Sequence, residues 1–332
     1  MRKLYFLVPG TSGPFACGGL WAELKTLQLA QQVCEAAVVT YRQREAGVLF
    51  LGDLLSGQRL DDGIFVVSWG FDVPKLVARL KGQQVIYHAH SAGYGFRLPA
   101  SIPIVTVSRN TLGYWGQRSP HSLLYYLPNQ ISDEFCNLHQ PRDIDVLVQA
   151  RKSSTYLLQQ LIPALQAVCS VQVVESYVED LPGLFNRAKV YLYDSAEYWA
   201  QQGVTEGFGL QPMEAMACGC QVFSSVNGGL SDYFDPGFNG QKIAGYATGY
   251  DVQRILDAVR SPIPDIPETF FAEYRTANII QRLEHILTDI NRFFDYQRDH
   301  AGDIPELTPR RIWSLRVQQL FKKVQKKLAK RS

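Results

Sequence analysis

Short runs of apolar residues alternate along the chain with longer stretches in which apolar residues recur every three or four positions. The short runs predict buried strands, and the recurring pattern predicts helices with one apolar side. In the first half of the chain a helix is expected at 20–33. Strands are expected there at 4–9, 37–41, 64–68, 84–90, 102–108 and 123–127. Strands that alternate with helices are typical of a parallel sheet covered on both faces.

The second half of the chain repeats this rhythm. Strands are expected at 145–149, 171–175, 189–193 and 221–224. Helices are expected at 154–168, 181–186, 212–217, 251–259 and 271–294. The predicted fold is α/β, with two doubly wound Rossmann-like domains that face a cleft, at 1–138 and 139–300, and a tail at 301–332. In such sheets ligands bind outside the carboxyl ends of the strands.

The composition is that of a folded globular protein, with 46% hydrophobic and 19% charged residues among 332. Net charge is only +2, but it is unevenly spread. Nine of the 33 Lys and Arg residues and none of the 31 Asp and Glu residues lie from Arg310 onward. The body therefore carries 24 basic and 31 acidic residues, and the tail is strongly basic.

The six cysteines have no spacing typical of a metal site, so we expect reduced thiols in a cytosolic protein. The apolar run that follows Met1-Arg2-Lys3 is too short for a signal peptide. The chain contains no stretch of ~18 uninterrupted apolar residues, so no membrane-spanning helix is expected.

The most informative chemistry lies in Glu206-Gly-Phe-Gly-Leu-Gln-Pro-Met-Glu214. Its glycines let backbone N–H groups approach a ligand, and the N-terminus of the helix expected at Pro212 attracts anions. The two carboxylates can accept hydrogen bonds from hydroxyl groups. This combination favours a ligand with both hydroxyls and phosphates, such as a nucleotide-sugar. The alternative is two solvated carboxylates, since Glu is common at a helix start.

The motif continues as Glu214-Ala-Met-Ala-Cys-Gly219-Cys-Gln-Val and is followed by Asn227-Gly-Gly-Leu-Ser-Asp232 and Asp235-Pro-Gly-Phe-Asn239-Gly240. In this order the elements resemble the family 4 retaining glycosyltransferases of the GT-B fold, from about residue 4 to about residue 290. Weaker matches are the loop that ends in Gly18-Gly19 and the segment Leu127-Pro-Asn129.

The resemblance implies transfer of a sugar from a nucleotide-diphosphate donor to an acceptor hydroxyl, with retained anomeric configuration. It also implies no cofactor and no divalent metal. The first domain would then be the acceptor side, and the second would bind the nucleotide-sugar. Glu214 would accept hydrogen bonds from the ribose, and Glu206 from the donor sugar. Backbone amides of Gly207, Phe208, Gly209 and Leu210 would contact sugar and phosphate.

The resemblance implies further site residues, and at some of them this sequence departs from the family pattern. The family usually has an Arg and, about five residues later, a Lys as diphosphate contacts. Arg151 and Lys152 are adjacent here, and both would be diphosphate contacts. His90, at the end of the expected strand 84–90, would touch the donor sugar. His88 would lie on the same face of that strand. Each histidine could instead be a hydrogen-bonded core residue.

Three further positions and one segment carry open alternatives. Gly18 and Gly19 could donate amides to the phosphate or to the acceptor, or could allow close packing of the first helix. Asn129 is a possible site residue. The segment 195–205 is longer than in the family, and it could be a lid or an acceptor-side loop. Its Tyr198 and Trp199 would then stack on sugars, or would simply pack.

The basic tail predicts an amphipathic helix that begins at Thr308-Pro309. Its apolar face would carry Trp313, Val317, Leu320, Phe321, Val324 and Leu328. A basic amphipathic helix with aromatic residues is typical of a segment that binds an anionic membrane surface, here through 308–330. Packing on the first domain is the alternative, and no nucleic-acid partner is expected.

We therefore expect a cytoplasmic hexosyl- or related transferase, peripheral on the inner face of the membrane, with a carbohydrate or lipid-linked acceptor. Its role would be synthesis of a cell-surface polysaccharide or glycolipid. The alternatives are a nucleotide-sugar isomerase or epimerase on the same fold, and a non-catalytic nucleotide-sugar-binding subunit. The sequence does not specify the base, the sugar, the linkage or the oligomeric state.

Overall fold

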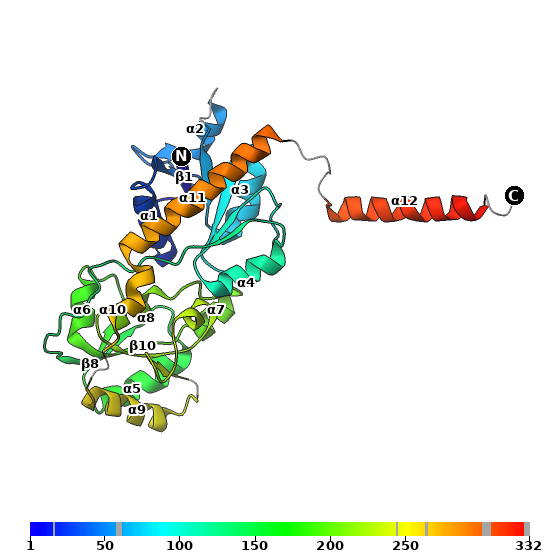
Figure 1. Ribbon diagram of the computed structural model, residues 1–332. Coiled ribbons are helices and arrows are strands. Elements are labelled where there is room, and N and C mark those ends of the chain that lie inside the picture. Colours follow the sequence, from blue (N-terminus) through cyan, green and yellow to red (C-terminus); the bar gives the residue numbers. More distant parts are fainter. Residues whose placement is uncertain (16, 58–61, 244, 263–264, 301–306, 329–332) are drawn as a thin grey trace. The chain divides into compact units, whose positions relative to one another are not determined.

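A computed structural model describes residues 1–332 except 16, 58–61, 244, 263–264, 301–306 and 329–332 (Figure 1). Contacts divide the chain into two compact units, Met1–Ile290 and Asn291–Ser332. The first unit contains both sheets. The predicted division at 138 and 300 stays a prediction, and residues 301–306 and 329–332 of the predicted tail lie outside the described residues.

The first sheet has seven parallel strands in the order β3-β2-β1-β4-β5-β6-β7. Their bounds are β1 Leu4–Val8, β2 Ala36–Thr40, β3 Leu49–Phe50, β4 Ile64–Val67, β5 Gln84–Ala89, β6 Ile104–Thr106 and β7 Leu124–Tyr126. The accompanying helices are α1 Gly18–Ala30, α2 Leu51–Ser56, α3 Val73–Arg79 and α4 Arg109–Arg118. The strand order reverses between β1 and β4, which creates a topological switch point where ligands bind in such sheets.

The second sheet has five parallel strands in the order β12-β11-β10-β8-β9. Their bounds are β8 Ile144–Gln149, β9 Val171–Val174, β10 Ala188–Tyr193, β11 Gln221–Ser224 and β12 Gln241–Lys242. Its helices are α5 Ile162–Gln166, α6 Leu181–Arg187, α7 Ala196–Gln202, α8 Leu210–Ala217 and α9 Thr248–Arg260. Here the order reverses between β8 and β10.

Alternate residues of β8 show that the second sheet is covered on both faces. Val146 and Val148 belong to a core that also contains Leu157 and Ile255, from the π-helical turn Leu157–Leu161 and from α9. Leu147 belongs to a second core, which contains side chains of α6 and α8. Because successive strand residues point to opposite faces, the near-continuous apolar run of β8 is the pattern of a doubly buried strand. The predicted doubly wound α/β architecture is confirmed.

Several elements differ from the prediction. The helix expected at 271–294 is broken into α10 Glu268–Phe271, a 3-10 turn Ala272–Tyr274 and α11 Thr276–Asp299. The expected loop at 195–205 contains helix α7. Strands β3 and β12 and helices α2, α3 and α4 were not predicted. Strands β3 and β12 have only two residues each, which is too short to leave an apolar run.

The second unit contains the end of α11 and helix α12 Pro309–Leu328. The Thr308 hydroxyl accepts a hydrogen bond from the backbone N–H of Arg311, as expected of an N-cap residue. Trp313 and Phe321 expose 69% and 66% of their surface. Among the described helices, none has the length and apolar content needed to cross a membrane.

Candidate active site

The motif that begins at Glu206 forms the turn between α7 and α8. Gly209 has a φ of +82°, and α8 begins at the next residue. A Cβ at Gly209 would lie 2.5 Å from the Leu230 side chain, so both conformation and space require glycine there. The helix therefore starts at Leu210, two residues before the predicted start at Pro212.

Gly207 brings this turn against the end of β5. A Cβ at Gly207 would lie only 1.6 Å from the backbone carbonyl oxygen of His90. On the other side, the N–H of Gly229 donates to the carbonyl of Glu206 at 2.8 Å. The glycines of both motifs thus let three backbone segments pack directly against each other, including the segment that carries His90.

Further bonds join the end of β5 to the residue before Glu206. The Ser91 hydroxyl donates to the Thr205 carbonyl at 2.5 Å, and the N–H of Thr205 donates to the Ala92 carbonyl at 3.1 Å. The Asp232 carboxylate accepts bonds from the N–H groups of Arg109 and Asn110 at the start of α4. Asp232, which ends the Asn-Gly-Gly motif, thus caps a helix that follows β6.

Glu206 is buried, and one oxygen of its carboxylate receives three hydrogen bonds. Oε2 accepts from the Tyr193 hydroxyl at 2.5 Å, from Nε1 of Trp199 at 2.6 Å and from the Ser195 hydroxyl at 3.2 Å. Burial, with Glu206 as its neighbour, raises the pKa of Tyr193 well above its usual value, which keeps the phenol a donor. Glu206 is therefore held rigidly, and Oε1 is the oxygen left for a ligand.

Helix α7 connects Glu206 to the basic pair at the end of β8. The Glu197 carboxylate accepts bonds from the N–H of Thr155 at 2.7 Å and from its hydroxyl at 2.9 Å. The Lys152 ammonium lies 4.5 Å from the centroid of the Trp199 ring. Trp199 therefore packs within the protein, because its N–H donates to Glu206 and its ring contacts Lys152.

The two residues of the basic pair differ in their surroundings. Lys152 has a φ of +70°, unusual for a residue other than glycine, and lies half-buried against Trp199. Arg151 is exposed. Lys152 is thus linked to Glu206 through one indole ring, whereas the structure places Arg151 at the surface beside it.

Glu214 lies in α8 and differs from Glu206 in its surroundings. It is 6% exposed, and the described part of the chain offers its carboxylate no hydrogen bond. Burial raises its pKa to about 7, against a lowering effect from Lys25 of α1 and a further increase from Glu134. The carboxylate oxygens of Glu214 could therefore accept hydrogen bonds from a ligand's hydroxyls.

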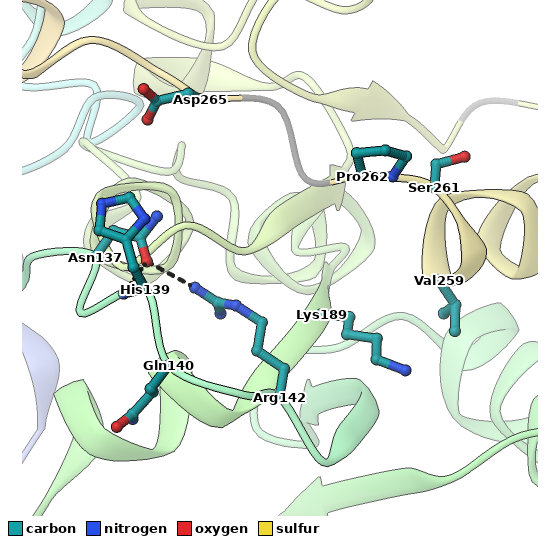
Figure 2. A pocket seen from close by; sticks show the side chains of 9 residues that line it. All are labelled: Asn137, His139, Gln140, Arg142, Lys189, Val259, Ser261, Pro262 and Asp265. Atoms are coloured by element: carbon teal, nitrogen blue, oxygen red, sulfur yellow. Dashed lines mark hydrogen bonds between the residues drawn. The ribbon is translucent and has the colours of Figure 1, made fainter.

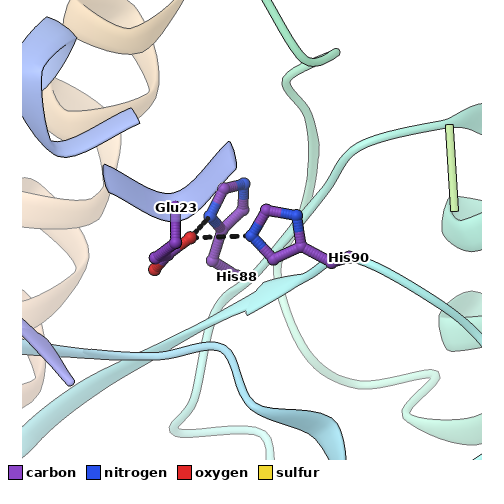
Figure 3. A group of neighbouring side chains, drawn as sticks. All are labelled: Glu23, His88 and His90. Atoms are coloured by element: carbon purple, nitrogen blue, oxygen red, sulfur yellow. Dashed lines mark hydrogen bonds and ion pairs between the residues drawn. The ribbon is translucent and has the colours of Figure 1, made fainter. Parts of the chain in front are cut away.

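His88 and His90 lie on one face of the chain at the end of β5, as predicted, with ring centroids 4.3 Å apart. Both contact Glu23 of α1, which the sequence analysis missed (Figure 3). No local pattern could have indicated Glu23, because 65 residues separate it from His88.

The remaining predicted positions are less constrained. A Cβ at Gly18 would meet nothing within 4 Å, so close packing of α1 does not require glycine there. At Gly19 the nearest atom would be Sγ of Cys17 at 3.9 Å. Asn129 is half-buried in the segment that follows β7. The site roles of all these residues stay predictions.

A cavity of about 540 Å³ lies elsewhere, at the amino ends of the second sheet (Figure 2). Its lining includes Arg142 and Lys189, and Lys189 is the second residue of β10. The Arg142 guanidinium donates to the carbonyls of Ala188 and Cys218 at 2.6 Å each, and Lys189 pairs with Asp145 at 2.7 Å. These cations hold the fold together, so this cavity is separate from the candidate active site.

Known proteins are similar to this chain in the sequence of one segment and in the fold. Residues 151–262 match the family described as "Glycosyl transferases group 1". No curated protein sequence matches the chain. Among solved structures, the chain is similar to a sucrose-phosphate synthase from Thermosynechococcus elongatus, with a TM-score of 0.61 and 14% identity over 88% of this chain and 100% of that one.

Two other structures give similar values. Anabaena HepE, solved in complex with UDP and glucose, has a TM-score of 0.60 and 14% identity over 87% of this chain and 100% of that one. A glycosyltransferase from Rickettsia africae has a TM-score of 0.60 and 10% identity over 88% and 99%. At this identity the likeness shows the fold, and the matched segment supports glycosyl transfer. Residues 151–262 thus match the group 1 glycosyl transferases, and the two parallel sheets have the GT-B glycosyltransferase fold.

Proposed function

We propose that the protein is a retaining, metal-independent glycosyltransferase that moves a hexose or related sugar from a nucleotide-diphosphate donor to an acceptor hydroxyl. The observation that carries this proposal is the contrast between the two carboxylates of the motif. Glu206 is fixed by three donors, whereas Glu214 is buried without one. Ribose hydroxyls would supply the donors that Glu214 lacks, and Oε1 of Glu206 would accept from the donor sugar.

The donor diphosphate would lie at the turn between these two residues. The backbone N–H groups of 207–210 and the N-terminus of α8 favour negative charge there. Lys152, with Arg151 beside it, would add positive charge to the leaving diphosphate. Stabilisation of that charge is the main catalytic contribution in this proposal. The leaving phosphate oxygen would take the proton of the acceptor hydroxyl on the same face of the sugar, which retains the configuration.

Uridine nucleotides are the first donors to test. Two of the similar Anabaena structures hold UDP or UDP-glucose. We propose the same nucleotide class for this chain because its matched segment includes both Glu206 and Glu214.

The acceptor side of the proposal rests on α12. The exposed apolar residues of this helix include Trp313, Leu320, Phe321 and Val324, and Arg316, Lys322 and Lys323 lie on the same helix. Such a segment binds anionic membrane surfaces through both apolar burial and charge. We propose peripheral association with the cytoplasmic face of a membrane and a carbohydrate or lipid-linked acceptor, in synthesis of a surface polysaccharide or glycolipid.

A panel of nucleotide-sugars tests the function. The purified protein is incubated with each donor, with and without lipid-linked and oligosaccharide acceptors, and nucleoside diphosphate release is measured. Acceptor-dependent release of diphosphate, lost in Glu206→Gln and kept in the surface control Glu179→Gln, is the expected result. A changed sugar without release would identify an isomerase instead, and binding without either would identify a non-catalytic subunit.

A further inference from the structure

A buried cluster of one carboxylate and two imidazoles joins α1 to the end of β5 (Figure 3). Oε2 of Glu23 lies 2.6 Å from Nδ1 of His88 and 2.7 Å from Nε2 of His90. The side chains of Glu23 and His88 are 2% and 4% exposed, and that of His90 is 16% exposed. His90 is therefore the member of the cluster that a ligand could reach.

The protons in this cluster can be assigned from its distances and charges. Burial by itself would raise the pKa of Glu23, but the two neighbouring histidines lower it to about 2. An ionised carboxylate only accepts hydrogen bonds, so each facing ring nitrogen must carry a proton. His88 thus donates through Nδ1 and His90 through Nε2.

The remaining nitrogen of His90 follows from burial. Burial, with His88 as a further cause, lowers the pKa of His90 below its usual value. The His90 ring is therefore neutral, so its one proton is on the Nε2 that faces Glu23 and its Nδ1 is bare.

This assignment determines what His90 can offer a ligand. Its Nε2–H is used by Glu23, and the described part of the chain provides no hydrogen bond to its Nδ1. The backbone of the same residue lies directly against Gly207, beside Glu206. An unprotonated Nδ1 is an acceptor, so it would suit a sugar hydroxyl and would not suit a phosphate oxygen.

A bound metal is the competing explanation for two histidines and a carboxylate within 4.8 Å of one another. Metal ligation would remove both protons from between the nitrogen and oxygen atoms. Distances of 2.6 and 2.7 Å between those atoms are typical of charge-assisted hydrogen bonds. The geometry favours the protonated cluster.

We propose that Glu23 is a positioning residue that accepts hydrogen bonds from Nδ1–H of His88 and Nε2–H of His90, so that His90 presents Nδ1 as a hydrogen-bond acceptor to a hydroxyl of the donor sugar. The assignment of these two protons stands on the cluster alone. The role toward the sugar rests on the proposed function.

Nitrogen NMR of the full chain tests the tautomers directly. The chain has six histidines, so long-range ¹H–¹⁵N spectra of ¹⁵N-histidine-labelled protein are simple to assign with His88→Asn and His90→Gln. At pH 7.5 we expect a proton on Nδ1 of His88 and, for His90, the Nε2–H pattern of a neutral ring. A proton on Nδ1 of His90, no proton on Nδ1 of His88, or stoichiometric Zn²⁺ binding that shifts both rings would overturn the proposal.

Variants at Glu23 connect the cluster to transfer. Glu23→Met removes the acceptor, and we expect His88 to lose its Nδ1–H pattern and kcat/KM to fall about 10-fold, the equivalent of one lost hydrogen bond. Glu23→Gln keeps an oxygen and should restore much of both, while UDP affinity stays unchanged in each variant. Wild-type protein that shows the tautomers but never releases UDP would refute the proposed function alone. A wild-type transferase whose rate is insensitive to Glu23→Met would refute the positioning role alone.

Discussion

Replacing Glu214 with Gln should make the protein more stable at alkaline pH and weaken its binding of UDP. The pKa of Glu214 is about 7, against an ordinary value of 4.5. A carboxyl whose pKa is raised by folding stabilises the folded state fully below pH 4.5. That contribution is lost as the pH rises towards 7. The difference corresponds to about 3 kcal/mol, because each pKa unit is worth ~1.4 kcal/mol.

Gln stays neutral at every pH, so Glu214→Gln should match the wild type near pH 4 and exceed its stability at pH 8. The gain there should approach the same ~3 kcal/mol. The measurement is the difference in free energy of unfolding between variant and wild type, from urea titrations at a series of pH values. Glu179→Gln, at an exposed position, serves as the control and should show no such trend. A stability difference that is the same at pH 5 and pH 8 would refute the raised pKa of Glu214.

Binding should respond in the opposite direction. Ribose hydroxyls donate to the ionised carboxylate, so wild-type affinity for UDP should rise about 10-fold from pH 6 to pH 8, as Glu214 ionises. In Glu214→Gln the affinity should be independent of pH over this range. At pH 8 it should be roughly 10- to 100-fold lower, the range for hydrogen bonds to a charged group. Calorimetric titration with UDP measures both effects. Equal affinities at pH 8 would remove Glu214 from the nucleotide site.

Three other changes test separate parts of the site. Trp199→Phe removes one donor from Glu206 and should lower kcat/KM about 10-fold with little change in UDP affinity; an unchanged rate would show that the remaining donors suffice. Lys152→Ala should reduce turnover roughly 100-fold if its charge stabilises the leaving diphosphate, and so should Arg151→Ala; a normal rate in either variant excludes that residue. Deletion of 307–332 should abolish co-sedimentation with anionic vesicles and leave UDP affinity intact; equal sedimentation of both forms would contradict membrane binding by α12.

The strands were predicted better than the helices because burial leaves a clearer sequence pattern in strands. Strands such as β1 and β8 are buried on both faces and leave continuous apolar runs. Helix α7 mixes aromatic, charged and small residues without a clear period, because its role is to connect Glu206 with Thr155. The segment therefore resembled an inserted loop.

The candidate site was predictable only where its residues are close in sequence. The turn from Glu206 to Glu214 contains its own glycines and helix start, so the chemistry could be inferred locally. Glu23 and Lys25 lie in an ordinary helical pattern, and they reach the site only because α1 packs beside the end of β5 and near α8. Such long-range pairs leave no spacing for a single sequence to display.

The bonds between residues 91–92 and Thr205, together with the cap that Asp232 forms on α4, have a consequence for turnover. Any motion that separates these segments must break several hydrogen bonds at once and expose the start of α4. Each bond contributes about 1 kcal/mol, so the joined arrangement is favoured even without substrate. The free energy required to separate these segments would then slow product release. A substitution that removes the Asp232 cap would speed release and leave the substrate-free protein less ordered.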